Sequence, residues 1–209
     1  MFNFSRIFQF RGLREAVAHG IKVDLLARLT QGFSVVADQF VANGIFGYDP
    51  TIKKREYDEK KAAELIAQAE QFGAVKTTLD LPKGLEVFGQ NVKSQLEKHR
   101  MDVKLNFLTP QELGKKITSG ESEFFFFGWK NDLGDSGDFL DAVIHSRTGD
   151  FGQFNGANYN NPEVDQLIDL AQESIEPKKR LEYLRQAMNI ITVQDIIGVV
   201  AILPLHQCE

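Results

Sequence analysis

Apolar residues recur along this chain with two different spacings. Spacings of three and four residues, typical of amphipathic helices, predict helices within residues 13–29, 58–72, 85–99, 109–120, 139–145, 161–171 and 177–191. The first of these segments is interrupted near Gly20, so it is expected to form two short helices. Alternating or continuous apolar runs predict strands at residues 75–81, 101–108, 124–127 and 196–203. Because helices and strands alternate, the pattern predicts an α/β fold with a mixed sheet flanked by helices.

Capping residues mark the ends of several predicted helices. Asp58 is a suitable N-cap, and Gly73 is a suitable terminating residue for the helix that Asp58 begins. Thr109 followed by Glu112 matches a capping box, and Asn161 before a proline is a further N-cap. Two segments rich in glycine, asparagine or aromatic residues are predicted to be loops: residues 31–50 and 147–160.

The most distinctive stretch is an unbroken run of four phenylalanines at residues 124–127, which leads into Gly128 and Trp129. A short apolar run bounded by turn residues is typical of a strand buried on both faces, so all four phenylalanines are expected in the core. A buried strand that delivers an aromatic side chain and a carboxylate into a loop is a common way to build a binding site. Trp129 and Asp132 are therefore candidate site residues, the alternative being that Trp129 only covers the end of a core.

Aspartates then recur every third residue in the polar segment that follows: Asp132, Asp135, Asp138 and Asp141. Carboxylates of this kind can hold Ca²⁺, but the segment lacks the register of a calcium loop and its bidentate glutamate. A carboxylate pair for glycoside hydrolysis has no further support in the sequence. Helix capping and solvation are the expected roles of the last three aspartates.

Composition and short motifs limit the partners, cofactors and activities that the chain is expected to have. The chain has 209 residues and a net charge of −5 without a basic stripe, so nucleic acid is not an expected partner. Cys208 is the only cysteine, which excludes an internal disulfide and a cysteine-based metal cluster. The sequence has no phosphate-binding glycine motif, no serine nucleophile elbow and no histidine pair with metal-ligand spacing. We therefore expect no cofactor, no metal site and no enzymatic activity.

Residues 128–140 resemble a segment of the family 5 extracellular solute-binding proteins, the peptide-binding receptors of ABC importers. The family pattern is Gly-Trp-x-x-Asp-x-x-Asp-Pro-x-x-Phe-Leu, and Gly128, Trp129, Asp132, Asp135 and Phe139-Leu140 match it. Further segments match in the family's order: Arg14-Glu15-Ala16, Gly47-Tyr48-Asp49-Pro50, Tyr57-Asp58, Tyr159-Asn160-Asn161-Pro162 and Arg180 with Tyr183.

The resemblance implies one lobe of a two-lobed, type II periplasmic-binding-protein fold. Residues 1–209 are expected to form a single domain, the carboxyl-terminal lobe, and to act with an amino-terminal lobe of the same parent chain. The implied function is capture of a peptide-like solute between the lobes and its delivery to a membrane permease. The parent is then periplasmic or extracellular, and lipid-anchored if it is Gram-positive.

The resemblance also implies a ligand site. In peptide-binding members the aspartate three residues after the tryptophan pairs with the ligand's α-ammonium group, and that position is Asp132. A carboxylate enclosed by lobe closure makes a charge-assisted hydrogen bond to such a cation. Trp129 would supply an apolar wall, and Asn131 and Tyr159 are candidates for the rim.

The sequence departs from the family pattern at two positions. Ser136 replaces the usual proline, and Phe126 stands where some oligopeptide binders carry an arginine for the ligand's carboxylate. The resemblance thus supports the ammonium end of a peptide site and not the carboxylate end. The family also includes nickel and sugar binders, so these ligands remain alternatives, as does a free-standing interaction domain without a transport role.

Overall fold

The computed structural model describes residues 1–29, 34–199 and 202–204. Its α-helices are α1 (Arg11–Gly20), α2 (Val23–Arg28), α3 (Glu59–Glu70), α4 (Glu86–Glu97), α5 (Pro110–Thr118), α6 (Ser136–Phe139), α7 (Pro162–Glu173) and α8 (Pro177–Asn189). A 3₁₀ turn and two π-helical turns accompany them: η1 (Ile7–Gln9), η2 (Leu140–Ile144) and η3 (Ile190–Gln194). The strands are β1 (Ser34–Val36), β2 (Lys76–Pro82), β3 (Asp102–Leu108), β4 (Phe124–Phe125) and β5 (Ile202–Pro204).

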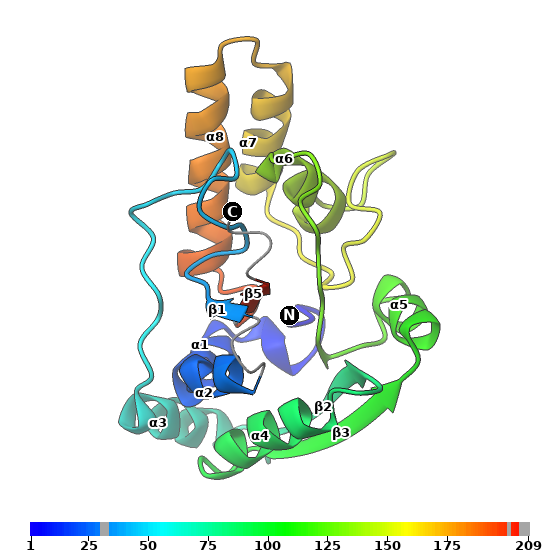
Figure 1. Cartoon of the computed structure of the whole chain (residues 1–209). Helices are drawn as coiled ribbons and strands as arrows, with labels where there is room; N and C mark the ends of the chain where they lie inside the picture. The colour runs from blue at the N-terminus through cyan, green and yellow to red at the C-terminus, as the bar shows by residue number, and fades with distance from the viewer. Residues whose placement is uncertain (30–33, 200–201, 205–209) are drawn as a thin grey trace.

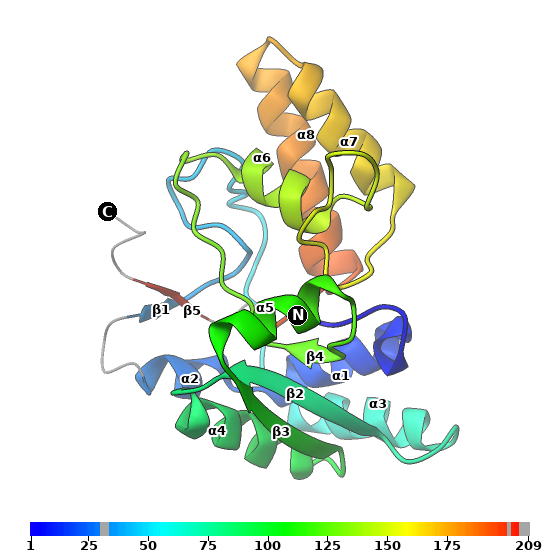
Figure 2. The same cartoon turned by 90° about the vertical axis from the view of Figure 1, so that its right-hand side faces the viewer.

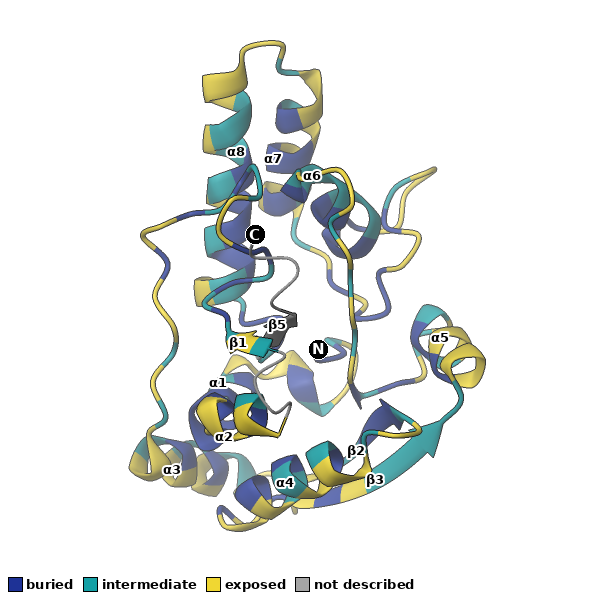
Figure 3. Ribbon diagram, viewed as in Figure 1, coloured by how far each residue is buried: buried dark blue, intermediate teal, exposed yellow. Residues whose placement is uncertain are grey.

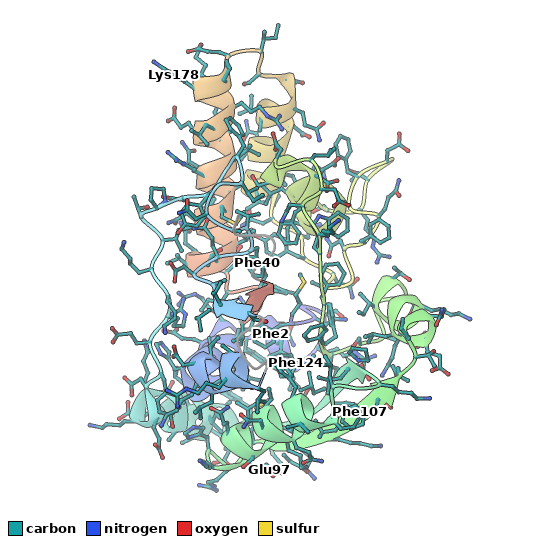
Figure 4. The ribbon with its side chains drawn as sticks, viewed as in Figure 1. Phe2, Phe40, Glu97, Phe107, Phe124 and Lys178 are labelled. Carbon is teal, nitrogen blue, oxygen red and sulfur yellow. The ribbon has the colours of Figure 1, made fainter. Side chains whose placement is uncertain are left out.

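The lower half of the molecule in Figure 1 is built on a three-stranded parallel sheet with the order β3-β2-β4. Parallel neighbours need crossover connections, and α4 and α5 supply them between β2 and β3 and between β3 and β4. Helix α1 packs on α3, and α4 packs on β3. The core of this half contains Leu79, Leu96 and Val103, and it extends to Phe2, whose ring stacks on that of Phe124 at 5.2 Å between centroids (Figure 4).

The upper half is helical. Helices α7 and α8 form an antiparallel hairpin that projects away from the sheet, with α6 and η2 beside it (Figures 1 and 2). Its core gathers Leu140, Ile144, Ile168 and Leu184, all at most 1% exposed. Figure 3 shows the inner faces of α7 and α8 buried and the hairpin tip exposed, as expected for amphipathic helices that pack on one side only.

A polar junction joins the two halves. The Arg14 guanidinium in α1 donates to the carbonyls of Phe8 at 2.6 Å and Asp195 at 2.7 Å. The Asp195 carboxylate accepts a short hydrogen bond from the Tyr159 hydroxyl and another, at 2.9 Å, from the Asn161 side chain. The junction therefore fixes α1 to the end of η3 and to the start of α7.

A second buried polar network sits on the central strand. The Asp80 side chain is fully buried and accepts from Lys116 at 2.7 Å, Asn106 at 2.6 Å and Ser122 at 2.5 Å. These three partners come from α5, β3 and the segment before β4. One carboxylate thus ties together the strands of the parallel sheet and a helix that connects them.

The predicted helices and their N-caps are confirmed, whereas the helix that Asp58 begins ends at Glu70 with Gln71, and not Gly73, as its C-cap. Asp58 accepts from the backbone N–H of Lys61, Asn161 accepts from Glu163, and Thr109 with Glu112 forms the full capping box. The α/β fold is also confirmed. Among the named strands, the antiparallel pair β1–β5 forms a sheet of its own, and β3-β2-β4 are all parallel; Phe2 adds an isolated antiparallel bridge to Phe124.

Three other local predictions were wrong. Residues 31–50, predicted as loop, contain β1, because Ser34–Val36 pairs with β5 far along the chain; residues 31–33 of that prediction lie outside the described residues. The phenylalanine run forms only the two-residue strand β4, and Phe126 is 36% exposed with its ring edge-on to Phe88. The last strand begins at Ile202 rather than 196, because Ile196 adopts a left-handed φ of 53° and breaks the extended chain; residues 200–201 of that prediction lie outside the described residues.

None of the helices in the described part of the chain combines the length and hydropathy that a membrane span requires.

Candidate functional site

The segment between β4 and α6 runs from the lower to the upper half (Figure 1) and carries three of the four predicted site residues. Its lower end is fixed because Phe126 N–H donates to the carbonyl of Asp80 at 2.9 Å. Its upper end pairs with Phe46, which donates to the Gly134 carbonyl at 2.9 Å and accepts from Ser136 N–H at 2.8 Å. The residues between these anchors, 127–133, form the loop that we call the Trp129 loop.

Trp129 lies within an aromatic cluster. Its ring stacks on Phe127, with 6.2 Å between centroids and an interplanar angle of 14°, and is tilted against Phe139 and Phe154. The indole N–H donates to Asp138 Oδ2 at 3.2 Å. Phe154 is 44% exposed, so the cluster presents an apolar aromatic surface beside the loop while its inner rings join the core.

The scaffold engages Asp135 and Asp138 through the loop and α6. Asp135 accepts from both Arg180 in α8, at 3.0 Å to each oxygen, and the backbone N–H of Gly137, at 2.7 Å. Asp138 accepts from Trp129. The capping role expected for Asp135 is confirmed, and both carboxylates hold the loop and α6 in place.

Asp132 is the exception, because its ion-pair partner comes from the Trp129 loop itself. Its carboxylate lies 2.5 Å from the ammonium of Lys130, and the two side chains are 67% and 68% exposed. Two short backbone bonds shape the loop here: Asp132 N–H to the Lys130 carbonyl at 3.0 Å, and Gly134 N–H to the Asn131 carbonyl at 3.2 Å. This turn places a carboxylate at the surface of the molecule beside the aromatic cluster.

The Asn131 side chain, unlike that of Asp132, has its oxygen buried in the protein. Its side-chain oxygen Oδ1 is buried and has no hydrogen-bond partner among the described residues. A buried acceptor without a donor costs roughly 1–3 kcal/mol, so a water molecule bound at this oxygen would be stabilising. The loop therefore presents the Asp132 carboxylate at the surface and keeps the Asn131 side-chain oxygen inside.

Tyr159 lies apart from this loop. The residue is 3% exposed, its ring packs edge-on against Phe4, and its hydroxyl donates to Asp195. Burial, followed by the bond to Asp195, raises the pKa of the hydroxyl above its usual range. Tyr159 thus belongs to the polar junction between the halves, and the structure does not bring it into contact with Trp129 or Asp132.

Asp141, the fourth aspartate, is the second residue of η2. Burial raises the pKa of its carboxyl, an effect that the neighbouring His145 opposes, and its Oδ1 has no hydrogen-bond partner in the described chain. No group of three or more histidine, cysteine or acidic side chains within the described ranges is placed to hold a metal ion.

Substituting Asp141 by asparagine is expected to raise the stability at neutral pH. A raised pKa in the native state means that folding favours the neutral carboxyl, so stability is greatest below the unfolded-state pKa and falls as the pH rises through the folded-state pKa. The neutral amide removes this penalty, a gain below about 1 kcal/mol because the site is partly solvated. Denaturant unfolding at several pH values should show the gain at neutral pH and its disappearance in acid; a loss of stability at neutral pH would contradict it.

Comparison with known proteins identifies the family of this chain. The family model described as bacterial extracellular solute-binding proteins, family 5 Middle, matches residues 1–151. The chain belongs to this family. Family 5 members are periplasmic or extracellular, and they are the substrate-binding components of ABC importers rather than a class of enzymes.

Individual family 5 proteins show the extent of the similarity. Heme-binding protein A of Haemophilus influenzae is 27% identical over 187 residues, which cover 86% of this chain and 34% of the relative. Di/tripeptide-binding protein 1 of Pseudomonas aeruginosa is 27% identical over 182 residues, covering 82% of this chain and 34% of the relative. The chain therefore spans about a third of the length of these relatives.

Solved structures agree with the fold. The periplasmic binding protein DppA of Helicobacter pylori, in complex with the peptide STSA, superposes with a TM-score of 0.88 at 27% identity, covering 97% of this chain and 40% of DppA. NikA of Staphylococcus aureus, in complex with Ni(L-His)₂, gives 0.82 at 19% identity, covering 97% of this chain and 43% of NikA. The predicted family 5 fold is thereby confirmed.

Some features of the loop have no local sequence signal. Phe154 reaches Trp129 from a predicted loop 25 positions later in the chain. Arg180, which holds Asp135, comes from α8, and the sequence indicated only that it matched the family. Lys130 was not singled out, although an ammonium two positions from the candidate carboxylate was visible in the sequence.

Proposed function

We propose that this chain is the carboxyl-terminal lobe of a two-lobed receptor that captures a peptide-like solute and delivers it to an ABC permease. The ligand's α-ammonium group binds Asp132, Trp129 supplies an apolar wall, and Asn131 borders the site. The observation that carries the proposal is the state of Asp132: the scaffold uses Asp135 and Asp138, whereas Asp132 is two-thirds exposed at the surface.

The neighbouring aromatic surface supports a peptide-like ligand. Ligand sites combine apolar walls with a few placed polar groups, and the Trp129 loop has this composition, with Phe154 beside it. The named ligands of two relatives at 27% identity, di/tripeptides and the peptide STSA, agree with it. Tyr159, buried in the junction, would act through the position of α7 rather than at the rim.

The site would be completed by the other lobe. A surface groove of about 450 Å³ runs along α8 and η3 from Lys178 to Gln194, and none of the four candidate residues lines it. A site that forms between two lobes is open on one lobe alone, so an enclosed hollow at Asp132 is not required. In a Gram-positive parent the receptor would be tethered by a lipid outside the cell.

Substituting Asp132 by asparagine is expected to weaken binding of short peptides roughly tenfold to a hundredfold, the usual contribution of a hydrogen bond to a charged group. Calorimetric titration of a parent chain that carries both lobes, with di- to tetrapeptides, measures this directly. N-acetylated peptides, which lack the ammonium, should bind the native and substituted proteins equally weakly.

Asp102→Asn is the matched control for this substitution. Asp102 is 63% exposed and pairs with Lys76 on the neighbouring strand, so its substitution should leave peptide affinity unchanged. Peptide affinity retained in Asp132→Asn would remove Asp132 from the site. Binding of nickel complexes or sugars in place of peptides would keep the fold and change the class of ligand, and binding of none of these ligands would favour a free-standing interaction domain.

A further inference from the structure

Asp132 and Asp135 pair with different kinds of cation. Asp135 pairs with Arg180, whose guanidinium is anchored through a second bond of 2.7 Å to the Ala171 carbonyl. Asp132 pairs with Lys130, a neighbour in the same loop whose side chain is 68% exposed. A lysine ammonium on a flexible stem is readily displaced, so the pair can open without disturbing the scaffold.

The backbone brings these two charges together. The Asp132 N–H bonds to the Lys130 carbonyl at 3.0 Å across a three-residue turn. Lys130 and Asp132 meet on the outer side of this turn, while Asn131 places its Oδ1 in the buried interior. The pair is therefore a product of the loop's own geometry, present before any ligand arrives.

We propose that Lys130 is an internal competitor for the ligand's ammonium group. This inference rests on the proposed function of Asp132. The Lys130 side chain ends in the same –NH₃⁺ group that a peptide presents, and at 2.5 Å it occupies one oxygen of the carboxylate. A ligand ammonium must displace it or share the carboxylate with it, and sharing places two positive charges side by side.

The proposal defines a class of substrate. Once displaced, Lys130 remains tethered two residues from Asp132 and keeps the surroundings of the ligand's first residue positive. Peptides whose first side chain is neutral or acidic are compatible with this charge, whereas peptides that begin with lysine or arginine are repelled. Lys130 thus determines specificity by charge, and it lowers the affinity for every peptide with a free amino end.

The test is the substitution Lys130→Met, which keeps the length of the apolar stem and removes the charge. In the two-lobed parent chain, calorimetry should show an affinity for Ala-Ala raised roughly two- to fivefold, the usual strength of an exposed ion pair. The gain should be larger for Lys-Ala than for Asp-Ala. Lys179→Met is the matched control, because Lys179 is 62% exposed and pairs with Glu176 at the distant tip of α8. Unchanged or lower affinity for Ala-Ala in Lys130→Met would overturn the proposal.

A second readout needs no peptide and separates this inference from the function on which it rests. In the 209-residue chain, the carboxyl ¹³C resonance of Asp132 should move in Lys130→Met and stay in place in Lys179→Met. An unmoved resonance would overturn the pairing even if peptides bind. A moved resonance without peptide binding by the parent chain would leave the ion pair in place and refute both the peptide site and the competition.

Discussion

Replacing Asp80 with alanine is expected to lower the free energy of unfolding by about 3 kcal/mol. The substitution leaves Lys116 without its counter-ion and leaves Asn106 and Ser122 without their shared acceptor. Loss of one member of a buried ion pair typically costs about 3–5 kcal/mol. The lower end applies because the Lys116 side chain is 28% exposed and can turn its ammonium to solvent.

Equilibrium unfolding in urea, followed by circular dichroism, measures this loss. The control is Asp102→Ala on the neighbouring strand, where the ion pair with Lys76 is long, at 3.7 Å, and about two-thirds exposed on both sides. Pairs of that kind contribute about 0–1 kcal/mol. Equal effects of the two substitutions would show that the buried network contributes no more than a surface pair.

Replacing Arg14 with methionine is expected to cost about 3–5 kcal/mol, because it removes the donors of a buried junction. The Arg14 side chain donates to the carbonyls of Phe8, Gln9 and Asp195 and lies over the ring of Phe4 at 4.1 Å. Each buried carbonyl left without a donor costs roughly 1–3 kcal/mol, which water entering the gap reduces. Methionine keeps the apolar stem, so most of the loss reports the guanidinium.

Arg11 provides the control for this substitution within the same helix. It lies three residues earlier and donates to the carbonyl of Gln194 at 2.6 Å, next to the acceptor of Arg14, but its side chain is 55% exposed. Water can replace its hydrogen bond, so Arg11→Met is expected to cost less than about 1 kcal/mol. A comparable loss from both substitutions, measured by urea unfolding, would contradict the role of burial at the junction.

The elements that could be predicted from the sequence are those whose signals are local. Thr109 and Glu112 form a capping box within one turn, and Asp58 and Asn161 cap helices through the adjacent backbone. Such signals do not depend on the rest of the fold. The order of helices and strands followed from them and from the apolar spacing.

The errors lie where distant segments decide the structure. Ser34–Val36 is a strand only because Ile202–Pro204 lies beside it. Phe126 has the same apolar neighbours in sequence as Phe125, yet Phe125 is 2% and Phe126 36% exposed, because the chain leaves the sheet between them. Hydrophobic character indicates which residues can be buried and not where an edge strand ends.

The candidate site also contains residues whose position could be predicted from the sequence and residues whose position could not. The resemblance to the family identified Asp132 and Trp129, and the structure places both on one loop between anchored ends. Tyr159 was matched by the same reasoning, but its hydroxyl bonds to Asp195 in the interior. A motif match conveys the chemistry of a residue, whereas its surroundings come from side chains that the motif does not include.

Trp129 is the only tryptophan among the 209 residues. Its indole stacks on Phe127 and donates to Asp138 within the loop that carries Asp132. The intrinsic fluorescence of the indole therefore originates in this one loop, without interference from another fluorophore of its kind. Under the proposed function, a solute that binds Asp132 would change the polarity around this indole, so these 209 residues carry an optical reporter for the proposed binding step.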